Sequence, residues 1–267
     1  MRCVFIGGYL RTGTTLVQNL LCGVPQTHAM VREAVLLGDL LESFRRSLTL
    51  FDEHSRDFFR DRAALQAHLQ TLVDAHLTHA HTHLGAPELM VLKRPQMTQH
   101  LPLLHRLRPT DRFIIMVRDP RDVVASALEA IARGAQEFST SSPARIAESM
   151  RVYTTNCTES RLASFHEQSL YLRYEDLVQH PSETLQLLSE FTGIALAADA
   201  AVTHAPAGRI DYDSPAQARR PLHSSLYGKA LSPVRIGNYK KVLTSAQIET
   251  VEQICAPILH RFGYKSG

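Results

Sequence analysis

Gly8-Tyr9-Leu10-Arg11-Thr12-Gly13-Thr14-Thr15 is the stretch of this chain that decides its fold. It follows an apolar run, Cys3-Val4-Phe5-Ile6, and precedes a helical pattern over about 14–22. A strand, a glycine loop and a helix in this order form a phosphate cradle, because the loop N–H groups and the helix N-terminus point toward the same anion. We therefore expect a phosphate-bearing ligand at this turn.

The loop departs from the pattern that binds nucleoside triphosphates. Gly8 and Gly13 have the P-loop spacing, but Thr14 and Thr15 follow them where that pattern has Lys and then Ser or Thr. The lysine that reaches the outer phosphates of a nucleotide is therefore absent, and Arg11 brings a positive charge inside the loop instead. This difference points away from ATP and toward another phosphate-bearing donor.

Composition indicates one large α/β domain over residues 1–267, with 44% hydrophobic and 21% charged residues. The formal net charge of +3 gives no general basic field, so we expect no nucleic-acid partner. The 4 cysteines show no CxxC spacing, which is typical of reduced, mostly buried thiols. No run approaches the roughly 20 apolar residues of a membrane span, and the first strand leaves no room for a signal peptide. We therefore expect a cytoplasmic protein.

Strands alternate with helices along the chain, which favours a parallel sheet with helices on both faces. Continuous apolar runs predict the strands Cys3–Ile6, Leu89–Leu92, Arg112–Val117 and Leu170–Leu172. Periodic patterns predict helices at about 14–22, 33–46, 62–83, 97–107, 120–133, 143–166, 181–192 and 245–262. The basic, Pro- and Gly-rich stretch 204–235 is either a lid over the ligand or a plain connection.

A second candidate anion site lies in Val117-Arg118-Asp119-Pro120-Arg121-Asp122 and Ser126. Asp119 is a favourable N-cap and Pro120 a favourable first helical residue, so a helix should begin there. Arg118 at the strand end and Ser126 on the helix can then grip one anion from two directions, since the guanidinium fork suits phosphate. Two other interpretations stay open, namely Mg²⁺ binding by Asp119 and a structural Arg–Asp pair.

Taken together, these motifs resemble the sulfotransferases that use 3′-phosphoadenosine 5′-phosphosulfate (PAPS). Arg11–Leu16 resembles the 5′-phosphosulfate loop of that family, and Val117–Asp122 with Ser126 resembles its 3′-phosphate site. Two further segments also match in order, Leu172–Leu177 followed by His180-Pro181, and Ile236-Gly237-Asn238-Tyr239-Lys240. The departures are Thr12, where Ser is common, and Tyr239, where Trp is common.

The resemblance implies a P-loop-containing three-layer sandwich that binds PAPS as donor and releases adenosine 3′,5′-bisphosphate (PAP), without a metal. It implies that the 5′ end is bound by Arg11, Thr12, Gly13, Thr14 and Thr15, and the 3′-phosphate by Arg118 and Ser126. Tyr174 would border the nucleotide, and Lys240 with the nucleotide-covering stretch 204–235 would close over it. The partner would be a hydroxyl-bearing acceptor, and a homodimer is left open.

The resemblance also implies a catalytic base. Sulfotransferases of phenols and steroids place a His two residues after a Lys, but this chain has Lys93-Arg94-Pro95 at that point. The tyrosine-modifying branch uses a Glu after the first helix, where this chain has Glu33. By this comparison Glu33 is the base, Lys93 stabilises the bridging oxygen and leaving phosphate, and Arg11 is a second cation. Alternatively, Glu33 starts the helix 33–46, and His28 is a reserve base.

Several functional alternatives stay open on the sequence alone. The acceptor would be a small molecule, glycolipid or natural product, with a peptide tyrosine as the alternative. A P-loop kinase or nucleotide hydrolase explains the two glycines, and a non-catalytic nucleotide-binding protein explains the whole fold. Among the 14 histidines, His79 and His83 are spaced for a metal but fit a solvated helix face, whereas His100 and His105 are predicted on a surface helix beside the acceptor.

Overall fold

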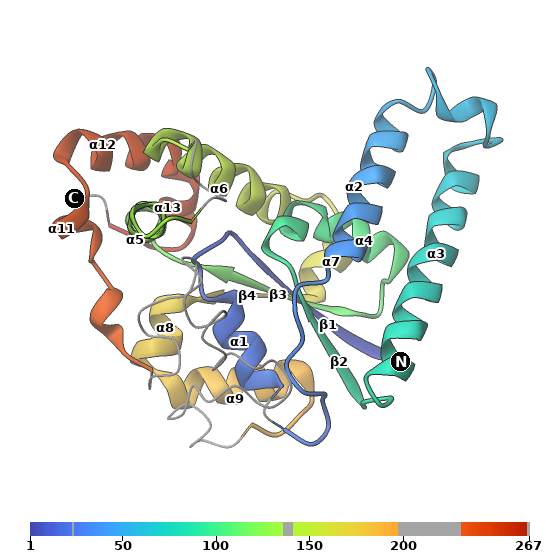
Figure 1. Ribbon diagram of the computed structural model, residues 1–267, viewed down its shortest axis with the longest axis horizontal. Coiled ribbons are helices and arrows are strands. Elements are labelled where there is room, and N and C mark those ends of the chain that lie inside the picture. Colours follow the sequence, from blue (N-terminus) through green and yellow to red (C-terminus); the bar gives the residue numbers. More distant parts are fainter. Residues whose placement is uncertain (23, 136–140, 197–230, 266–267) are drawn as a thin grey trace.

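The computed structural model describes residues 1–22, 24–135, 141–196 and 231–265. Its centre is a parallel sheet of four strands, β1 (Arg2–Gly8), β2 (Leu89–Lys93), β3 (Arg112–Val117) and β4 (Ser169–Arg173), in the order β2-β1-β3-β4 (Figure 1). All four strands that the sequence predicts are present. Most of the predicted covering stretch, residues 204–230, lies outside the described residues.

The strands are continuous apolar runs because both faces of the sheet are covered. In β1, Cys3 and Phe5 enter the core on one face, whereas Val4 and Ile6 enter the core on the other. The parallel register places Ile6 beside both Lys93 of β2 and Ile114 of β3. This alternation makes the three-layer α/β sandwich that the sequence predicts.

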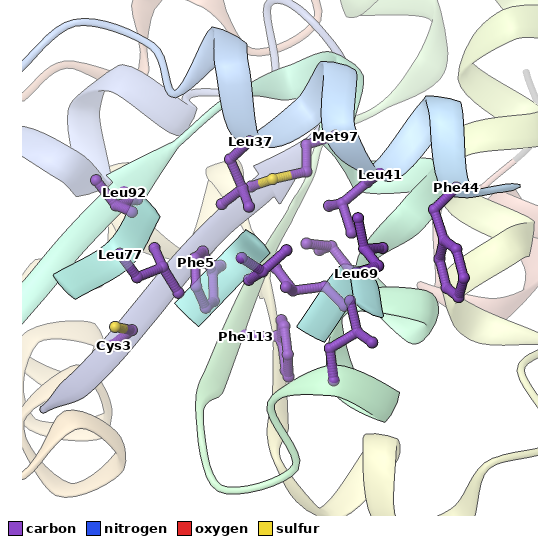
Figure 2. Close-up of a cluster of buried hydrophobic side chains, with 14 of the residues drawn as sticks. Cys3, Phe5, Leu37, Leu41, Phe44, Leu69, Leu77, Leu92, Met97 and Phe113 are labelled. Atoms are coloured by element: carbon purple, nitrogen blue, oxygen red, sulfur yellow. The ribbon is translucent and has the colours of Figure 1, made fainter. Parts of the chain in front are cut away.

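One face is covered by α2 (Val35–Thr49), α3 (Arg62–His83), the short 3₁₀ helix η2 (Pro95–His100), α4 (Leu101–Leu107) and α7 (Ala163–Glu167). Figure 2 shows how Leu37 and Leu41 of α2 and Leu69 and Leu77 of α3 gather with Phe5 above the sheet. α2 and α3 extend past the sheet, and the segment that joins them, which includes the 3₁₀ helix η1 (Ser55–Asp57), stands well away from it (Figure 1).

The opposite face is covered by α1 (Thr14–Leu21), α8 (Tyr174–Gln179) and α9 (Pro181–Thr192). A third cluster beside the sheet contains α5 (Pro120–Ala132), α6 (Pro143–Thr158), α11 (Tyr239–Val242), α12 (Ser245–Ile254) and α13 (Ala256–Arg261). The 3₁₀ helix η5 (Pro233–Arg235) contacts α8. The predicted start of α5 is confirmed, because Asp119 caps it and Pro120 is its first residue. None of the described helices is long and apolar enough to cross a bilayer.

Two predicted helices are each broken in two. The predicted helix 143–166 ends at Thr158 and resumes as α7 at Ala163, which turns Phe165 into the core against Phe113. The predicted helix 245–262 breaks at Cys255, because Pro257 in the first turn of α13 has no N–H to continue it. All 4 cysteines are buried free thiols, as the sequence predicts.

The strand order locates the crevice of the sheet. The chain leaves β1 for β2 on one side and then crosses to β3 on the other, so the connections diverge between β1 and β3. Open parallel sheets bind ligands beyond the carboxyl ends of the strands at such a switch point. Gly8, Lys93, Arg118 and Tyr174 all lie at or just beyond those ends.

Candidate active site

The glycine loop is a tight turn whose backbone only glycine tolerates at two points. Gly8 has φ 128°, and a Cβ there would lie 2.6 Å from the carbonyl oxygen of Met116. Gly13 has φ 100° and precedes α1 directly, with a ring carbon of Tyr174 3.1 Å from its ideal Cβ position. Thr12 is buried and its hydroxyl donates to the carbonyl of Tyr9 at 2.6 Å. The loop is therefore held in one conformation before any ligand arrives.

The start of α1 is available to an anion. No side chain caps this helix, and no acidic residue lies in its first turn. The first N–H groups of a helix have no partner within the helix, so an uncapped N-terminus attracts negative charge. Thr14 and Thr15 are its first two residues. The predicted 5′ cradle therefore has the open donors that a phosphosulfate group requires.

The predicted 3′ site lies directly against this loop. Arg11 Nε donates to Ser126 Oγ at 3.0 Å, and Arg118 Nη1 donates to the carbonyl of Arg11 at 3.1 Å. The Arg118 guanidinium also lies over the ring of Tyr174, 4.4 Å from its centroid. Arg118 is buried, and its Nε has no hydrogen-bond partner among the described residues. The structure thus brings Arg11, Arg118, Ser126 and Tyr174 together.

Asp119 forms a structural Arg–Asp pair, which is one of the two interpretations that the sequence left open for it. Its carboxylate accepts from the main-chain N–H of Arg121 at 2.9 Å and from the Arg121 guanidinium at 2.7 Å. It caps α5 and pairs with Arg121, so it is a structural residue at the edge of the site.

The electrostatics of the site favour an anion. Burial, as the largest cause, and the neighbouring guanidinium groups of Arg118, Arg133 and Arg235 together lower the pKa of Arg11 to about 10, whereas Glu129 opposes them. A buried cation whose pKa is lowered by neighbouring positive charge gains most from a bound anion. This cluster therefore has the charge that a doubly phosphorylated ligand would neutralise.

The carboxy-terminal segment, residues 235–240, is attached to α5 by two acidic residues. Asp122 accepts from the main-chain N–H groups of Gly237 at 2.7 Å and Tyr239 at 2.9 Å. Glu129 accepts from Arg235 at 2.9 Å and from Asn238 at 3.0 Å. Arg118 Nη2 donates to the carbonyl of Arg235 at 2.9 Å, which joins this segment to the 3′ site.

Sequence reasoning missed Asp122 and Glu129 as functional residues. The available signal was that two acidic residues lie in the same helix as Ser126, in an otherwise cationic site. One of the two, Asp122, is buried. Burial raises the pKa of Asp122, whereas the two main-chain donors and Arg118 oppose that rise. Lys240 lies in the attached segment but is exposed, with its ammonium 6.0 Å from the centroid of the Tyr239 ring.

The other half of the site joins Glu33, Lys93 and Thr15. Lys93 Nζ lies 2.8 Å from Glu33 Oε1 and 3.3 Å from Thr15 Oγ1. The Lys93 side chain is only 8% exposed, whereas that of Glu33 is 36% exposed. The chain brings a carboxylate, an ammonium group and the glycine loop to one point, although they are far apart in sequence.

Glu33 does not begin a helix, which removes one of its alternative roles. α2 begins at Val35, Ala34 precedes it, and no side chain caps it. The main-chain N–H of Ala34 instead donates to the carbonyl of Lys93 at 3.0 Å. This bond fixes the backbone beside Glu33 to the end of β2, so the carboxylate is aimed at Lys93.

The histidines contribute structure to this region. In His28, Nε2 accepts from the N–H of Val91 at 2.9 Å and Nδ1 lies 2.8 Å from the carbonyl of Ala29, so both ring nitrogens are engaged. The surface location predicted for His100 and His105 is wrong, because both are buried. His105 packs between Phe113 and Phe165 in the core.

His79 and His83 stack on α3 with ring centroids 6.5 Å apart. Over the part of the chain that the structure describes, no three His, Cys, Asp or Glu side chains gather as metal ligands would.

Comparison with known proteins identifies the family of this chain. The model of the sulfotransferase family matches residues 3–198, which contain the glycine loop, Glu33, Lys93, Arg118 and Ser126. The chain belongs to the sulfotransferase family. This sulfotransferase is accordingly an enzyme, and the kinase and nucleotide-hydrolase alternatives are set aside.

Relatives and solved structures agree with that family. A Caenorhabditis briggsae protein, provisionally named a protein-tyrosine sulfotransferase, is 30% identical over 193 residues, which cover 70% of this chain and 64% of the relative. Protein-tyrosine sulfotransferase 2 of Gallus gallus is 27% identical over 205 residues, 73% of this chain and 52% of the relative. The sulfotransferase thus spans between about half and two thirds of the length of these relatives.

The fold is shared with solved sulfotransferase structures. The sulfotransferase domain from the curacin biosynthetic pathway matches with a TM-score of 0.65 and 18% identity, covering 100% of this chain and 99% of that one. A mouse sulfotransferase complexed with PAP matches with a TM-score of 0.50 and 12% identity, covering 97% of this chain and 85% of that one. At these identities the likeness shows the fold.

Proposed function

We propose that this sulfotransferase transfers a sulfuryl group from PAPS to the hydroxyl group of an acceptor and releases PAP. The observation that carries the proposal is the contact of Lys93 with both Glu33 and Thr15, because it joins a carboxylate and a cation to the start of the glycine-loop helix. A transfer enzyme needs these three parts within reach of one reacting atom.

The donor assignment is supported by the fit of two anion cradles. No described side chain caps the start of α1, which suits the 5′-phosphosulfate. The buried Nε of Arg118 has no partner among the described residues and, with its neighbours, suits the 3′-phosphate. These cradles consist of N–H groups and cationic side chains, which compensate charge where nucleoside-triphosphate enzymes use Mg²⁺. The mouse neighbour of the same fold binds PAP, the product of such a donor. We therefore propose PAPS as donor, with no required metal.

In the proposed reaction, Glu33 accepts the proton of the acceptor hydroxyl as its oxygen attacks sulfur. The new oxygen–sulfur bond forms while the bond between sulfur and the bridging phosphate oxygen breaks, and the electron pair leaves with PAP. Lys93 donates a hydrogen bond to that bridging oxygen, where negative charge develops. Arg11 stabilises the phosphate and the transferred group from the loop. No covalent enzyme intermediate is needed.

The acceptor we favour is a phenolic hydroxyl, first of all the tyrosine of a peptide. Two relatives carry the name protein-tyrosine sulfotransferase. Glu33 is partly open to solvent, and the next apolar side chains, Val35 and Leu36, are 52% and 56% exposed, so a large acceptor has access to the base. A small phenol, a glycolipid or a natural product is the second class of acceptor.

The single-domain organisation, the cytoplasmic location and a homodimer stay predictions.

The test is transfer of ³⁵S from labelled PAPS, in buffer containing EDTA, to three acceptors: a tyrosine-containing peptide, a simple phenol and an aliphatic alcohol. We expect labelled peptide or phenol and an equal amount of PAP. The Glu33→Gln variant should bind PAP as the wild type does but transfer about 10²- to 10⁴-fold more slowly, the range for loss of a general base.

The outcomes separate the parts of the proposal. Label on the aliphatic alcohol alone would replace the phenolic acceptor and keep the reaction. Full activity of Glu33→Gln would remove Glu33 as base. PAP binding without transfer to any hydroxyl would contradict the proposed function as a whole.

A further inference from the structure

A buried glutamine connects the donor cradle to the loop that carries Glu33. Gln18 lies on α1, one turn after Thr14 and Thr15, and its side chain is fully buried. Its Nε2 donates to the carbonyl oxygen of Val31 at 3.0 Å. Only the amide nitrogen can donate to a carbonyl, so this contact fixes which way the amide faces.

The second polar atom of the Gln18 side chain is its amide oxygen, Oε1. This atom is buried and has no hydrogen-bond partner among the described residues. A buried acceptor without a donor costs stability, and an apolar side chain of similar size would avoid that cost. Its neighbours on the helix, Val17, Leu20 and Leu21, belong to the apolar core. The hydrogen bond to Val31 is therefore what this side chain supplies and an apolar one would not.

That hydrogen bond lies next to the proposed base. Val31 stands two residues before Glu33, and the main chain immediately after Glu33 is held by the bond from Ala34 to Lys93. The carboxylate therefore lies between two anchored points, one tied to α1 and one tied to β2. The Gln18 bond is thus one of two main-chain anchors that the described residues place beside Glu33.

We infer that Gln18 is a positioning residue that holds Glu33 in register with the phosphosulfate loop. It acts through Glu33 rather than on the substrates, and the inference rests on the proposed function of Glu33 as base. Because α1 begins at the phosphosulfate cradle, Gln18 connects that cradle to the base loop. The same side chain thus joins donor binding to acceptor activation.

The test is the Gln18→Met variant, which keeps the volume and removes the donor. We expect kcat to fall by about 10- to 100-fold, the cost of a small misplacement of a catalytic group. The KM for PAPS and the affinity for PAP should stay within about twofold, because Gln18 contributes no atom to the proposed donor cradles. The matched control is Thr192→Val, which removes another buried hydrogen bond to a main-chain carbonyl, in α9. It should lower the melting temperature without lowering kcat.

A double-mutant cycle separates positioning from general destabilisation. In the Glu33→Gln background, adding Gln18→Met should slow transfer by less than about twofold, because the group that Gln18 positions is already disabled. If the two losses simply multiply, or if Gln18→Met retains wild-type kcat while Glu33→Gln is slow, the inference is wrong. If Gln18→Met does not fold, Gln18→Asn, whose amide is too short to reach Val31, replaces it with the same expectations. If Glu33→Gln itself keeps full activity, the base assignment in the proposed function fails instead.

Discussion

The donor side and the acceptor side of the site are built in different ways. On the donor side, Arg118, Thr12 and Asp122 are buried and joined by hydrogen bonds to the loop, to α5 and to the carboxy-terminal segment. On the acceptor side, Glu33 is partly open and the apolar side chains of Val35 and Leu36 face solvent. If the proposed function holds, a hydrogen-bonded donor cradle beside an open acceptor entrance would let one donor serve acceptors of different size.

Lys93 stands between the two sides, and among the further variants proposed below its loss should have the largest effect. The Lys93→Met variant removes the hydrogen bonds to Glu33 and Thr15. It also removes the cation that we propose for the leaving oxygen. We expect kcat to fall by about 10²- to 10³-fold, as when one transition-state donor is removed. Steady-state transfer assays measure it, with the exposed Lys241→Met as the control. Unchanged kcat would show that the two sides do not meet at Lys93.

Arg118 tests the donor side alone. The Arg118→Met variant removes the proposed 3′-phosphate contact, and a hydrogen bond to a charged group is worth about 1.5–3 kcal/mol. We expect the affinity for PAP to fall by about 10- to 100-fold. Affinity for adenosine 5′-phosphosulfate, which lacks the 3′-phosphate, should stay within about threefold.

Arg112→Met is the matched control for this measurement, because Arg112 stands at the other end of β3 and stacks on Phe191. An equal loss for both nucleotides in the Arg118 variant would place Arg118 outside the 3′ site.

The proposed donor side could be predicted from the sequence because its signals are local. The apolar runs give the strands, because both faces of a parallel sheet are buried, and the two glycines give the loop, because their backbone conformations exclude other residues. Asp122 and Glu129 were not found, since their partners near residue 237 are distant in sequence.

The errors also have local causes. His105 lies on the same face of α4 as Leu101 and Leu104, so the apolar periodicity indicates a buried position. The surface prediction followed the polarity of the imidazole instead and was wrong. The turn that separates α6 from α7 depends on the packing of Phe165 against Phe113, which no neighbouring residue specifies. The acceptor side was hardest to predict because its chemistry depends on loops and exposed side chains.

Asp122 tests how the carboxy-terminal segment supports the donor side. In the Asp122→Asn variant, one of the two acceptors for Gly237 and Tyr239 becomes an N–H donor. The loss of about one hydrogen bond, about 1 kcal/mol, should weaken PAP binding by about fivefold. Calorimetry measures it, and Asp176→Asn, on exposed α8 surface, is the control. An unchanged affinity for PAP would show that this segment does not support nucleotide binding.

The smallest effect we expect is a loss of stability in mild acid. Burial lowers the pKa of His28, His100 and His105 below the ordinary 6.5. They are neutral when folded, so the unfolded chain binds more protons as pH falls below 6.5, and this contribution to stability is lost through that range. Denaturant unfolding at pH 7.5 and 5.5 should show it, with a smaller difference in His105→Leu. An equal pH dependence in that variant would assign the effect to other groups.

The most direct test of the central claim, that two cationic cradles select a doubly phosphorylated adenylate donor without a metal, is a calorimetric titration with PAP. We expect saturable one-to-one binding in EDTA that added Mg²⁺ does not strengthen, and no comparable binding of ATP with Mg²⁺. Absence of PAP binding, or stronger binding of ATP with Mg²⁺, would contradict the account.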